Sequence, residues 1–260
     1  MSLLKEDKRV NQISKYKEKA EKFIKDLNNK SLKDCLGIPK KLERNESVKK
    51  GWIHDKCVFK SGSSNTITEK RICKCFYYRN RCRKNSMCQK DNCKIRFFKK
   101  EYKLNNCDVL DYEIPINYVT SKIGEFDLLI KYGNDSYAVE VKPPNSKETI
   151  LRMILEILTY DFCNCYNEDC PDDYNHNISA IIKNVHPKEK SKLKDGIHYK
   201  LGIAFFEFKD NDKISKQLSQ FKEHEKNKDY IISILNKYKI SVFKIIKEPQ
   251  VGYKIEKIYN

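Results

Sequence analysis

The sequence contains no run of about 18 apolar residues, so no segment of it is predicted to cross a bilayer as a helix. Its first residues become charged after two leucines, which is not the pattern of a secretory signal peptide. Internal repeats and low-complexity linkers are absent as well. We therefore expect a cytoplasmic protein that has no membrane partner.

Signatures of nucleotide-binding enzymes are also missing. There is no Walker-type phosphate loop and no glycine fingerprint for a dinucleotide. No histidine lies in a pattern typical of nucleophilic catalysis or of an H-N-H nuclease; the five are His54, His176, His186, His198 and His224. Carboxylates, amines and thiols remain as the candidate reactive groups.

Acidic residues are in short supply. The chain has 36 Asp and Glu against 53 Lys and Arg, which gives a formal net charge of +17 and a pI near 9.2. A surplus of this size favours a polyanionic partner, nucleic acid first. A basic surface that is only solvated would give the same charge, so composition alone leaves both interpretations open.

Three regions are predicted: a helical segment over 1–56, a basic cysteine-rich metal-binding insertion over 57–107, and an α/β core with a C-terminal extension over 108–260. Apolar residues at helical spacing predict a helix over 1–30. The other predicted helices cover 145–162, with Asn145 and Glu148 as a capping box, and 213–236. Predicted strands cover 108–119, 125–132, 136–142, 178–185, 199–208, 239–247 and 251–259. This order predicts an α/β fold with a mixed sheet.

The strands over 125–132 and 136–142 are predicted to form a hairpin that turns at 133–135. Alternation along the strands places Asp127 on the face opposite Phe126, and lets Asp127 meet Glu140 beside Lys142. Adjacent carboxylates repel unless a cation lies between them, and Mg²⁺ or Mn²⁺ takes such oxygen ligands. An amine next to the ion can stabilise developing charge, so the pattern predicts metal-assisted hydrolysis of a phosphodiester. The alternative is a surface ion pair between Glu140 and Lys142.

The predicted helix over 145–162 is apolar nearly all round, which is typical of a buried helix. Its polar residues Arg152, Glu156 and Tyr160 follow one another at four-residue spacing and form one stripe. Such a stripe indicates a wet or occupied cavity. The alternative is an Arg152–Glu156 pair on an exposed edge.

These motifs together resemble the PD-(D/E)xK nuclease superfamily. Asp127 followed by Glu140-Val141-Lys142 matches its signature, although Phe126 stands where many members have proline. Gly124-x-x-Asp127 is similar to a motif of the RecB-like branch, in which this acid binds metal. Glu156-x-x-x-Tyr160 resembles the Gln-x-x-x-Tyr motif of that branch, with glutamate in place of glutamine.

The resemblance implies a restriction-endonuclease-like αβββαβ core with a mixed sheet. It implies that Asp127 and Glu140 hold Mg²⁺ or Mn²⁺, that Lys142 acts on the water or the transition state, and that Glu156 and Tyr160 support catalysis. Members often add a glutamate from the first core helix; Glu18 and Glu21 are both candidates, and Glu113 on the first core strand is a weaker one. Glu125 is expected to face away from Asp127.

Cysteines are abundant, at eleven, and are not expected to form disulfides in a reducing compartment. One cluster is predicted to ligate zinc through a subset of its members, which are Cys73, Cys75, Cys82, Cys88 and Cys93. A second cluster lies near His176 in the sequence and consists of Cys163, Cys165 and Cys170. We expect either that these cysteines bind zinc together with His176 or that they bind no metal. By resemblance to iron–sulfur members of the RecB-like branch, they also admit an iron–sulfur cluster.

The region between Glu69 and Lys103 has thirteen Lys and Arg against three acids, interleaved with aromatic residues. Such a segment is typical of nucleic-acid binding. The predicted contacts are Arg79, Arg81, Arg83, Lys84, Arg96 and Arg152. The leading hypothesis is a divalent-metal-dependent nuclease that acts on DNA, with a homodimer as one way to cut duplexes. The alternative is a zinc-containing nucleic-acid-binding protein on an inactive nuclease-like scaffold.

Overall fold

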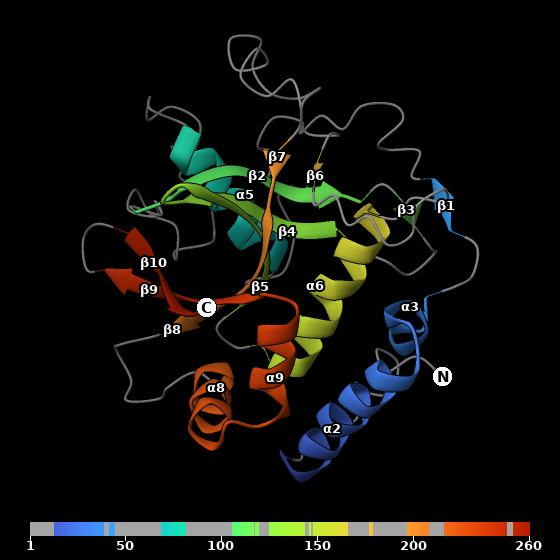
Figure 1. The fold of residues 1–260 in the computed structure, drawn as a ribbon. Coiled ribbons are helices and arrows are strands. Elements are labelled where there is room, and N and C mark those ends of the chain that lie inside the picture. The colour runs from blue at the N-terminus through green and yellow to red at the C-terminus, as the bar shows by residue number, and fades with distance from the viewer. Residues whose placement is uncertain are drawn as a thin grey trace, which may run out of the picture.

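The computed structural model describes residues 13–38, 42–44, 69–81, 106–116, 118–119, 125–143, 146, 148–165, 177–178, 197–207, 216–248 and 252–260. Within them a six-stranded mixed sheet has helices on both faces, which confirms the prediction of a mixed α/β fold (Figure 1). None of the described helices is long and apolar enough to span a membrane.

The central sheet has its strands in the order β10-β9-β8-β5-β4-β2. Strands β2, β4 and β5 form an antiparallel meander, β8 and β9 run parallel to β5, and β10 pairs antiparallel with β9. Within this sheet, β2, β4 and β5 precede helix α6 and β8 follows it, which is the predicted βββαβ order. The strands are β2 (Asp108–Pro115), β4 (Glu125–Tyr132), β5 (Asp135–Lys142), β8 (Lys200–Glu207), β9 (Ser241–Glu248) and β10 (Gly252–Tyr259).

Two short strand pairs lie outside this sheet. Strand β1 (Glu43–Arg44) pairs with β3 (Tyr118–Val119), and β6 (Asn177–Ile178) pairs with β7 (Ile197–His198). The strand predicted over 178–185 begins at the end of β6, and its remainder lies outside the described residues.

The turn between β4 and β5 has two residues, Gly133 and Asn134, because Tyr132 already pairs with Asp135. Gly133 has a φ of +62°, which a residue without a Cβ atom adopts at little steric cost. The predicted turn was therefore one residue too long. The short turn fixes the register, and the register decides which side chains of β4 and β5 are neighbours.

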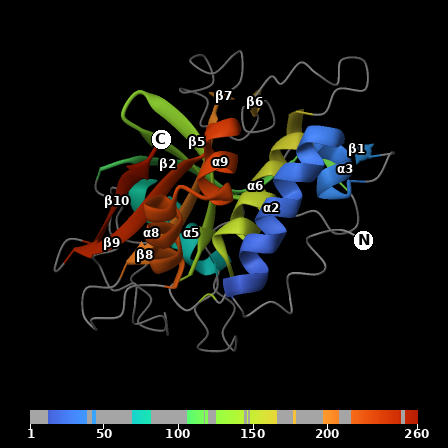
Figure 2. The ribbon, with the colours of Figure 1, turned by 60° about the horizontal axis from the view of Figure 1, so that its bottom comes forward.

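One face of the sheet is covered by α6, with α2, α3, α8 and α9 arranged around it, whereas α5 covers the other face (Figures 1 and 2). Each face buries its own apolar cluster: Ala138 packs on the α6 side, while Val139 packs with Ile72 and Phe76 of α5. The helices are α2 (Ile13–Asn29), α3 (Leu32–Leu36), α5 (Glu69–Arg81), α6 (Ile150–Cys165), α8 (Lys216–Asn227) and α9 (Tyr230–Lys237).

Two predicted helices have different bounds in the structure. Helix α6 starts at Ile150 rather than 145, because Thr149 Oγ1 accepts a hydrogen bond from Arg152 N at 3.3 Å and caps the helix. The predicted helix over 213–236 is divided into α8 and α9. Asp229 caps α9 by accepting from Ile231 N at 3.0 Å, and Lys228 before it has a φ of +47°.

Helix α5 lies inside the region that the sequence assigns to a separate cysteine-rich insertion. Its residues Ile72, Cys73 and Phe76 are fully buried against the sheet, and the Phe76 ring contacts Phe206 and Tyr253. Residues 69–81 of the predicted insertion therefore form a helix that packs on the central sheet. The metal-binding part of that prediction falls largely outside the described residues.

Candidate metal centre

The hairpin strands β4 and β5 separate at the end opposite their turn. Their ladder stops at Leu128 and Val139, although β4 still pairs with β2 and β5 still pairs with β8 beyond that point. Asp127 occupies the opening, and its Oδ2 atom accepts a hydrogen bond from Val141 N at 2.7 Å. A side chain thus replaces the backbone partner that Val141 would have in a continuous ladder.

The same separation corrects the predicted alternation along β4. Phe126 was expected on the same face as Leu128, yet it packs in the α6-side cluster, where its ring contacts Tyr160 and Tyr199 with centroids 6.0 and 5.6 Å away. Regular alternation is lost because the β4–β5 ladder ends between these residues. On the neighbouring strand, Glu113 has a φ of +46°, which marks a second backbone irregularity beside the opening.

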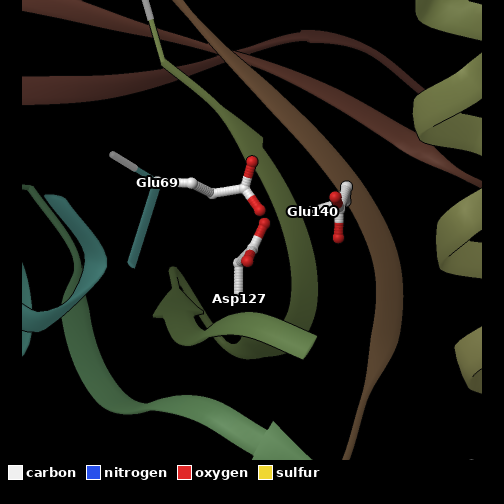
Figure 3. A group of neighbouring side chains, drawn as sticks. All are labelled: Glu69, Asp127 and Glu140. Carbon is white, nitrogen blue, oxygen red and sulfur yellow. The ribbon is translucent and has the colours of Figure 1, made fainter. Parts of the chain in front are cut away.

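Three carboxylates converge at this opening: Glu69, Asp127 and Glu140. One oxygen of each lies within 4.8 Å of the others, and Figure 3 shows Glu69 reaching toward Asp127 with Glu140 beside them. They come from three elements, the first residue of α5, the start of β4 and the end of β5. Asp127 and Glu140 are 7% and 2% exposed, so the site is set into the protein.

Lys142 fills the other side of the cluster. Its Nζ atom lies 2.5 Å from Glu140, 2.9 Å from Glu156 and 3.1 Å from both Glu69 and Glu148. The predicted residues Asp127, Glu140 and Lys142 therefore meet in one buried site, and Glu140–Lys142 is not the surface pair that the alternative described.

The polar stripe of α6 lines the same site. Glu156 is buried against Lys142, and its Oε1 atom accepts from Arg152 Nε at 2.6 Å. The Arg152–Glu156 pair of the alternative interpretation exists, but Glu156 is 7% exposed and faces the lysine instead of an exposed edge. Tyr160, which is partly buried, stands one turn further along α6.

Negative charge is in excess here. Among the described residues, five carboxylates lie around Lys142 and Arg152, so that five negative charges face two positive ones if all are ionised; the acids are Glu69, Asp127, Glu140, Glu148 and Glu156. Burial, and then the Glu69 carboxylate, raise the pKa of Asp127 well above its usual range. Burial and the neighbouring Asp127 do the same to the pKa of Glu140.

Other groups respond to the same surroundings. Burial alone would lower the pKa of Lys142, but Glu140 and the other carboxylates raise it far above its ordinary value. Burial would raise the pKa of Glu156, yet Lys142 and Arg152 hold it below the usual range. Burial raises the pKa of Tyr160, so its hydroxyl stays protonated near neutral pH. Of Asp127, Glu140 and Glu156, it is therefore Glu156 that gives up its proton most readily.

The donor set fits a hard divalent cation. Carboxylate oxygens are the ligands that Mg²⁺ and Mn²⁺ prefer, and three of them from separate elements face one another. Glu140 Oε2 is buried and has no hydrogen-bond donor among the described residues, which is costly for a carboxylate oxygen. A cation bound by Glu69, Asp127 and Glu140 would satisfy this atom and offset the excess negative charge.

Sequence reasoning missed two members of the site. Glu69 was counted only as an acid of the basic region, although it opens a helix whose Ile72, Cys73 and Phe76 are spaced to bury one face. Glu148 was assigned to a capping box, but its carboxylate contacts Lys142. The apolar spacing of α5 was the signal that a core helix, and therefore a possible site glutamate, lay there.

The glutamates considered for the first core helix lie elsewhere. Glu18 is exposed on α2, and Glu21 pairs on the same surface with Lys25 at 2.7 Å. Glu113 and Glu125 flank the opening and lie 3.9 and 3.5 Å from Lys70 Nζ. Neither of the two candidates joins the carboxylate cluster, and the helical glutamate that does so among the described residues is Glu69 of α5.

The cysteine clusters are described only in part. Cys73 is fully buried in the α5-side core, and burial raises the pKa of its thiol well above the ordinary value, which is the setting of a packing residue. Cys163 is likewise buried, with its pKa raised to about 12 by burial, whereas Cys165 lies near Asp161 and Tyr199. The side chain of Cys75, and all of Cys82, Cys88, Cys93 and Cys170, lie outside the description.

Most of the predicted nucleic-acid contacts also lie outside the described residues. Arg79 and Arg81 belong to the last turn of α5, but the description does not extend to their side chains, and Arg83, Lys84 and Arg96 fall beyond that helix. Arg152 is described, and its guanidinium lies at the border of the site. These predictions otherwise stay predictions.

Comparisons with known proteins add little to this geometry. No protein-family model and no curated protein matches the chain. Among solved structures, it is similar to Pyrococcus furiosus SfsA in complex with Ca²⁺, at 15% sequence identity and a TM-score of 0.21. The match covers 60% of this chain and 55% of that one, so the chain spans little more than half of the SfsA chain. Similarity at this level identifies neither a family nor a function.

Proposed function

We propose that the protein is a divalent-metal-dependent nuclease of the PD-(D/E)xK type, which hydrolyses phosphodiester bonds in DNA. The observation that carries the proposal is the buried meeting of Glu69, Asp127 and Glu140 with the Lys142 ammonium. Carboxylates that hold a cation, and an amine at their border, are the groups that metal-assisted hydrolysis needs. The basic character of the whole chain favours a polyanionic substrate.

Each side chain has a role that follows from its place. Glu69, Asp127 and Glu140 would hold Mg²⁺ or Mn²⁺, which when bound supplies Lewis-acid polarisation of the scissile phosphate and a more acidic water. Lys142 lies beside Glu140 and would stabilise negative charge on the phosphate oxygens as the bond to the leaving oxygen breaks. Arg152 pairs with Glu156 and is the more exposed of the two, and it would contact a backbone phosphate.

The test is cleavage of single- and double-stranded DNA with Mg²⁺ or Mn²⁺ by the wild type, Asp127→Asn and Asp135→Asn. Asp135 is the matched control because it is an acid of the same hairpin, paired with Lys200 at 2.8 Å near the turn. We expect Asp127→Asn to lower kcat by about a thousandfold, roughly 4 kcal/mol in activation free energy, and Asp135→Asn to leave it unchanged. Equal, metal-independent rates for all three proteins would refute the proposal.

The cysteine predictions become a separate proposal, that the chain also carries zinc or an iron–sulfur cluster. Elemental analysis and the visible spectrum of the purified protein decide between these. A zinc content near one per chain without colour supports zinc, and a brown protein with iron supports the cluster. Metal-free protein that still cleaves DNA with added Mg²⁺ would leave the nuclease proposal intact and remove this one.

A further inference from the structure

The segment that joins β5 to α6 carries Glu148, and helix α8 holds that segment from the side. Gln217 is 1% exposed, and its side-chain amide donates to Ser146 O at 2.8 Å and to Glu148 O at 3.2 Å. Gln220, 6% exposed, accepts from Ile150 N at 3.4 Å. Two buried glutamines of α8 thus bind backbone groups just before and at the start of α6.

The connecting segment is also shaped by its own hydrogen bonds. Ser146 N donates to Pro143 O at 2.9 Å, and Ser146 Oγ accepts from Glu148 N at 3.2 Å. The Glu148 side chain is 44% exposed, so little apolar packing holds it, yet its carboxylate lies 3.1 Å from Lys142 Nζ. Its position therefore depends mainly on the backbone that the glutamines hold.

Buried amides that serve only as core packing are rare, because each donor must find an acceptor. Both hydrogen bonds from Gln217 Nε2 go to backbone carbonyls of the connecting segment. These carbonyls precede α6, which starts only at Ile150, so they are not part of the helix. The amide therefore connects α8, which lies outside the βββαβ succession, to the site. The contacts run from Gln217 through the Glu148 backbone to the Glu148 carboxylate and on to Lys142.

We infer that Gln217 is a positioning residue of the metal centre, which together with Gln220 fixes Glu148 so that its carboxylate orients the Lys142 ammonium. The inference rests on the proposed nuclease function. Among the described residues of the connecting segment, Glu148 is the one that contacts Lys142, while Glu69, Glu140 and Glu156 stand on regular elements. Loss of this contact leaves the cation ligands in place, and the ammonium is then oriented by the three remaining carboxylates alone.

The test compares Gln217→Met, Glu148→Gln and the double variant with Ser219→Ala as the control. Methionine keeps the length of glutamine without its donors, and Ser219 is an exposed residue of α8 whose hydroxyl donates to Lys216 O of the same helix. We expect each of the first two variants to lower kcat roughly tenfold to a hundredfold, with KM for DNA within about twofold. The double variant should be no slower than the slower single variant, because both changes act through one carboxylate.

A purely structural role for Gln217 predicts a different pattern. The melting temperature would fall, kcat well below the melting temperature would equal that of the wild type, and Glu148→Gln would have no effect. That result overturns the inference, as does a double variant whose losses multiply. Should Gln217→Met fail to fold, Glu148→Gln can still be measured, since its side chain is 44% exposed, and an unchanged kcat in that variant overturns the inference.

If the wild type does not cleave DNA, the proposed function fails. That result is distinct from a failure of the inference about Gln217. The inference then has a readout without activity, the urea midpoints of the same four proteins. If the midpoint shift of the double variant is smaller than the sum of the shifts of Gln217→Met and Glu148→Gln, the two residues share one contact. Additive shifts would overturn the inference whether or not the protein cleaves DNA.

Discussion

The two faces of strand β5 carry opposite kinds of side chain within eight residues. Tyr137, Val139 and Val141 point into the α5-side core, where any apolar group of suitable volume would serve in place of the two valines. On the other face, Ala138 packs against the α6-side core, while Glu140 and Lys142 are just as deeply buried but charged. Strand alternation alone separates the two sets.

The comparison shows what it takes to bury charge in a sheet. The apolar face is stabilised by removal of its surface from water, and its neighbours need only fill space. The charged face needs partners of defined chemistry, and they come from separate places: Glu69 from α5, Glu148 from the connecting segment and Glu156 from α6. Changes on the charged face should therefore alter chemistry and pH response, and changes on the apolar face should alter stability alone.

The largest effect on stability is expected from Lys142→Met. This change removes the ammonium that four carboxylates contact and leaves their charges facing one another. Breaking a buried ion pair in this way costs about 3–5 kcal/mol, so the urea midpoint should fall sharply at pH 8 without divalent cations. Activity should be lost as well, because the ammonium would no longer stabilise the phosphate.

Lys200→Met is the matched control for that experiment. Lys200 is an amine of the adjacent strand β8, and it pairs with Asp135 at 2.8 Å on the exposed end of the hairpin. Its removal should leave the urea midpoint unchanged, since exposed pairs contribute little. Equal midpoints for Lys142→Met and the wild type would show that the carboxylates do not need the ammonium, and the contrast between the faces would fail.

A smaller loss of stability, with no loss of catalytic activity, is expected from Val139→Ala on the apolar face. Val139 is fully buried in the cluster that also contains Ile72 and Phe243, so the substitution leaves a cavity and destabilises the fold by about 2 kcal/mol. Measured well below the melting temperature, kcat should equal that of the wild type. A variant that keeps its melting temperature but loses activity would show that this face also serves the site.

How much of this could be predicted from the sequence depends on distance along the chain. Strands β4 and β5 and the meeting of Asp127, Glu140 and Lys142 were predicted, because alternation and a short turn are local properties. Glu69 was missed because it reaches Lys142 from 73 positions away, through the packing of α5 on the sheet. The one local signal of that packing, the spacing of Ile72, Cys73 and Phe76, lies in a region rich in charge and cysteine.

Phe126 and Glu148 show a second kind of failure, in which a local rule holds until the site interrupts it. Alternation fails at Phe126 because the β4–β5 ladder stops beside Asp127. The capping-box pattern at Asn145 and Glu148 fails because Thr149 caps the helix and Glu148 contacts the lysine. In both places tertiary contacts of the site override the local signal.

The smallest effect, and the sharpest test of the charged face, is a pH-dependent stabilisation by Mg²⁺. The pKa values of Asp127 and Glu140 are raised in the folded protein, first by burial, so the folded state binds more protons than the unfolded state above the ordinary carboxyl range. Stability without Mg²⁺ should then fall as pH rises toward the raised pKa values. Mg²⁺ needs the ionised carboxylates, so it should bind more tightly over the same interval.

The difference in melting temperature with and without Mg²⁺ should therefore grow between pH 5 and pH 8, reaching about 3–6 °C when Mg²⁺ is present at roughly a hundred times its Kd. Asp127→Asn should abolish most of this difference, and Asp135→Asn, whose acid lies at the exposed turn, should retain it. A stabilisation by Mg²⁺ that is constant with pH, or equal in both variants, would place the ion away from Asp127. Val139→Ala should lower every melting temperature by the same amount and leave the dependence on pH and Mg²⁺ intact, because the two faces of β5 share a backbone but not their chemistry.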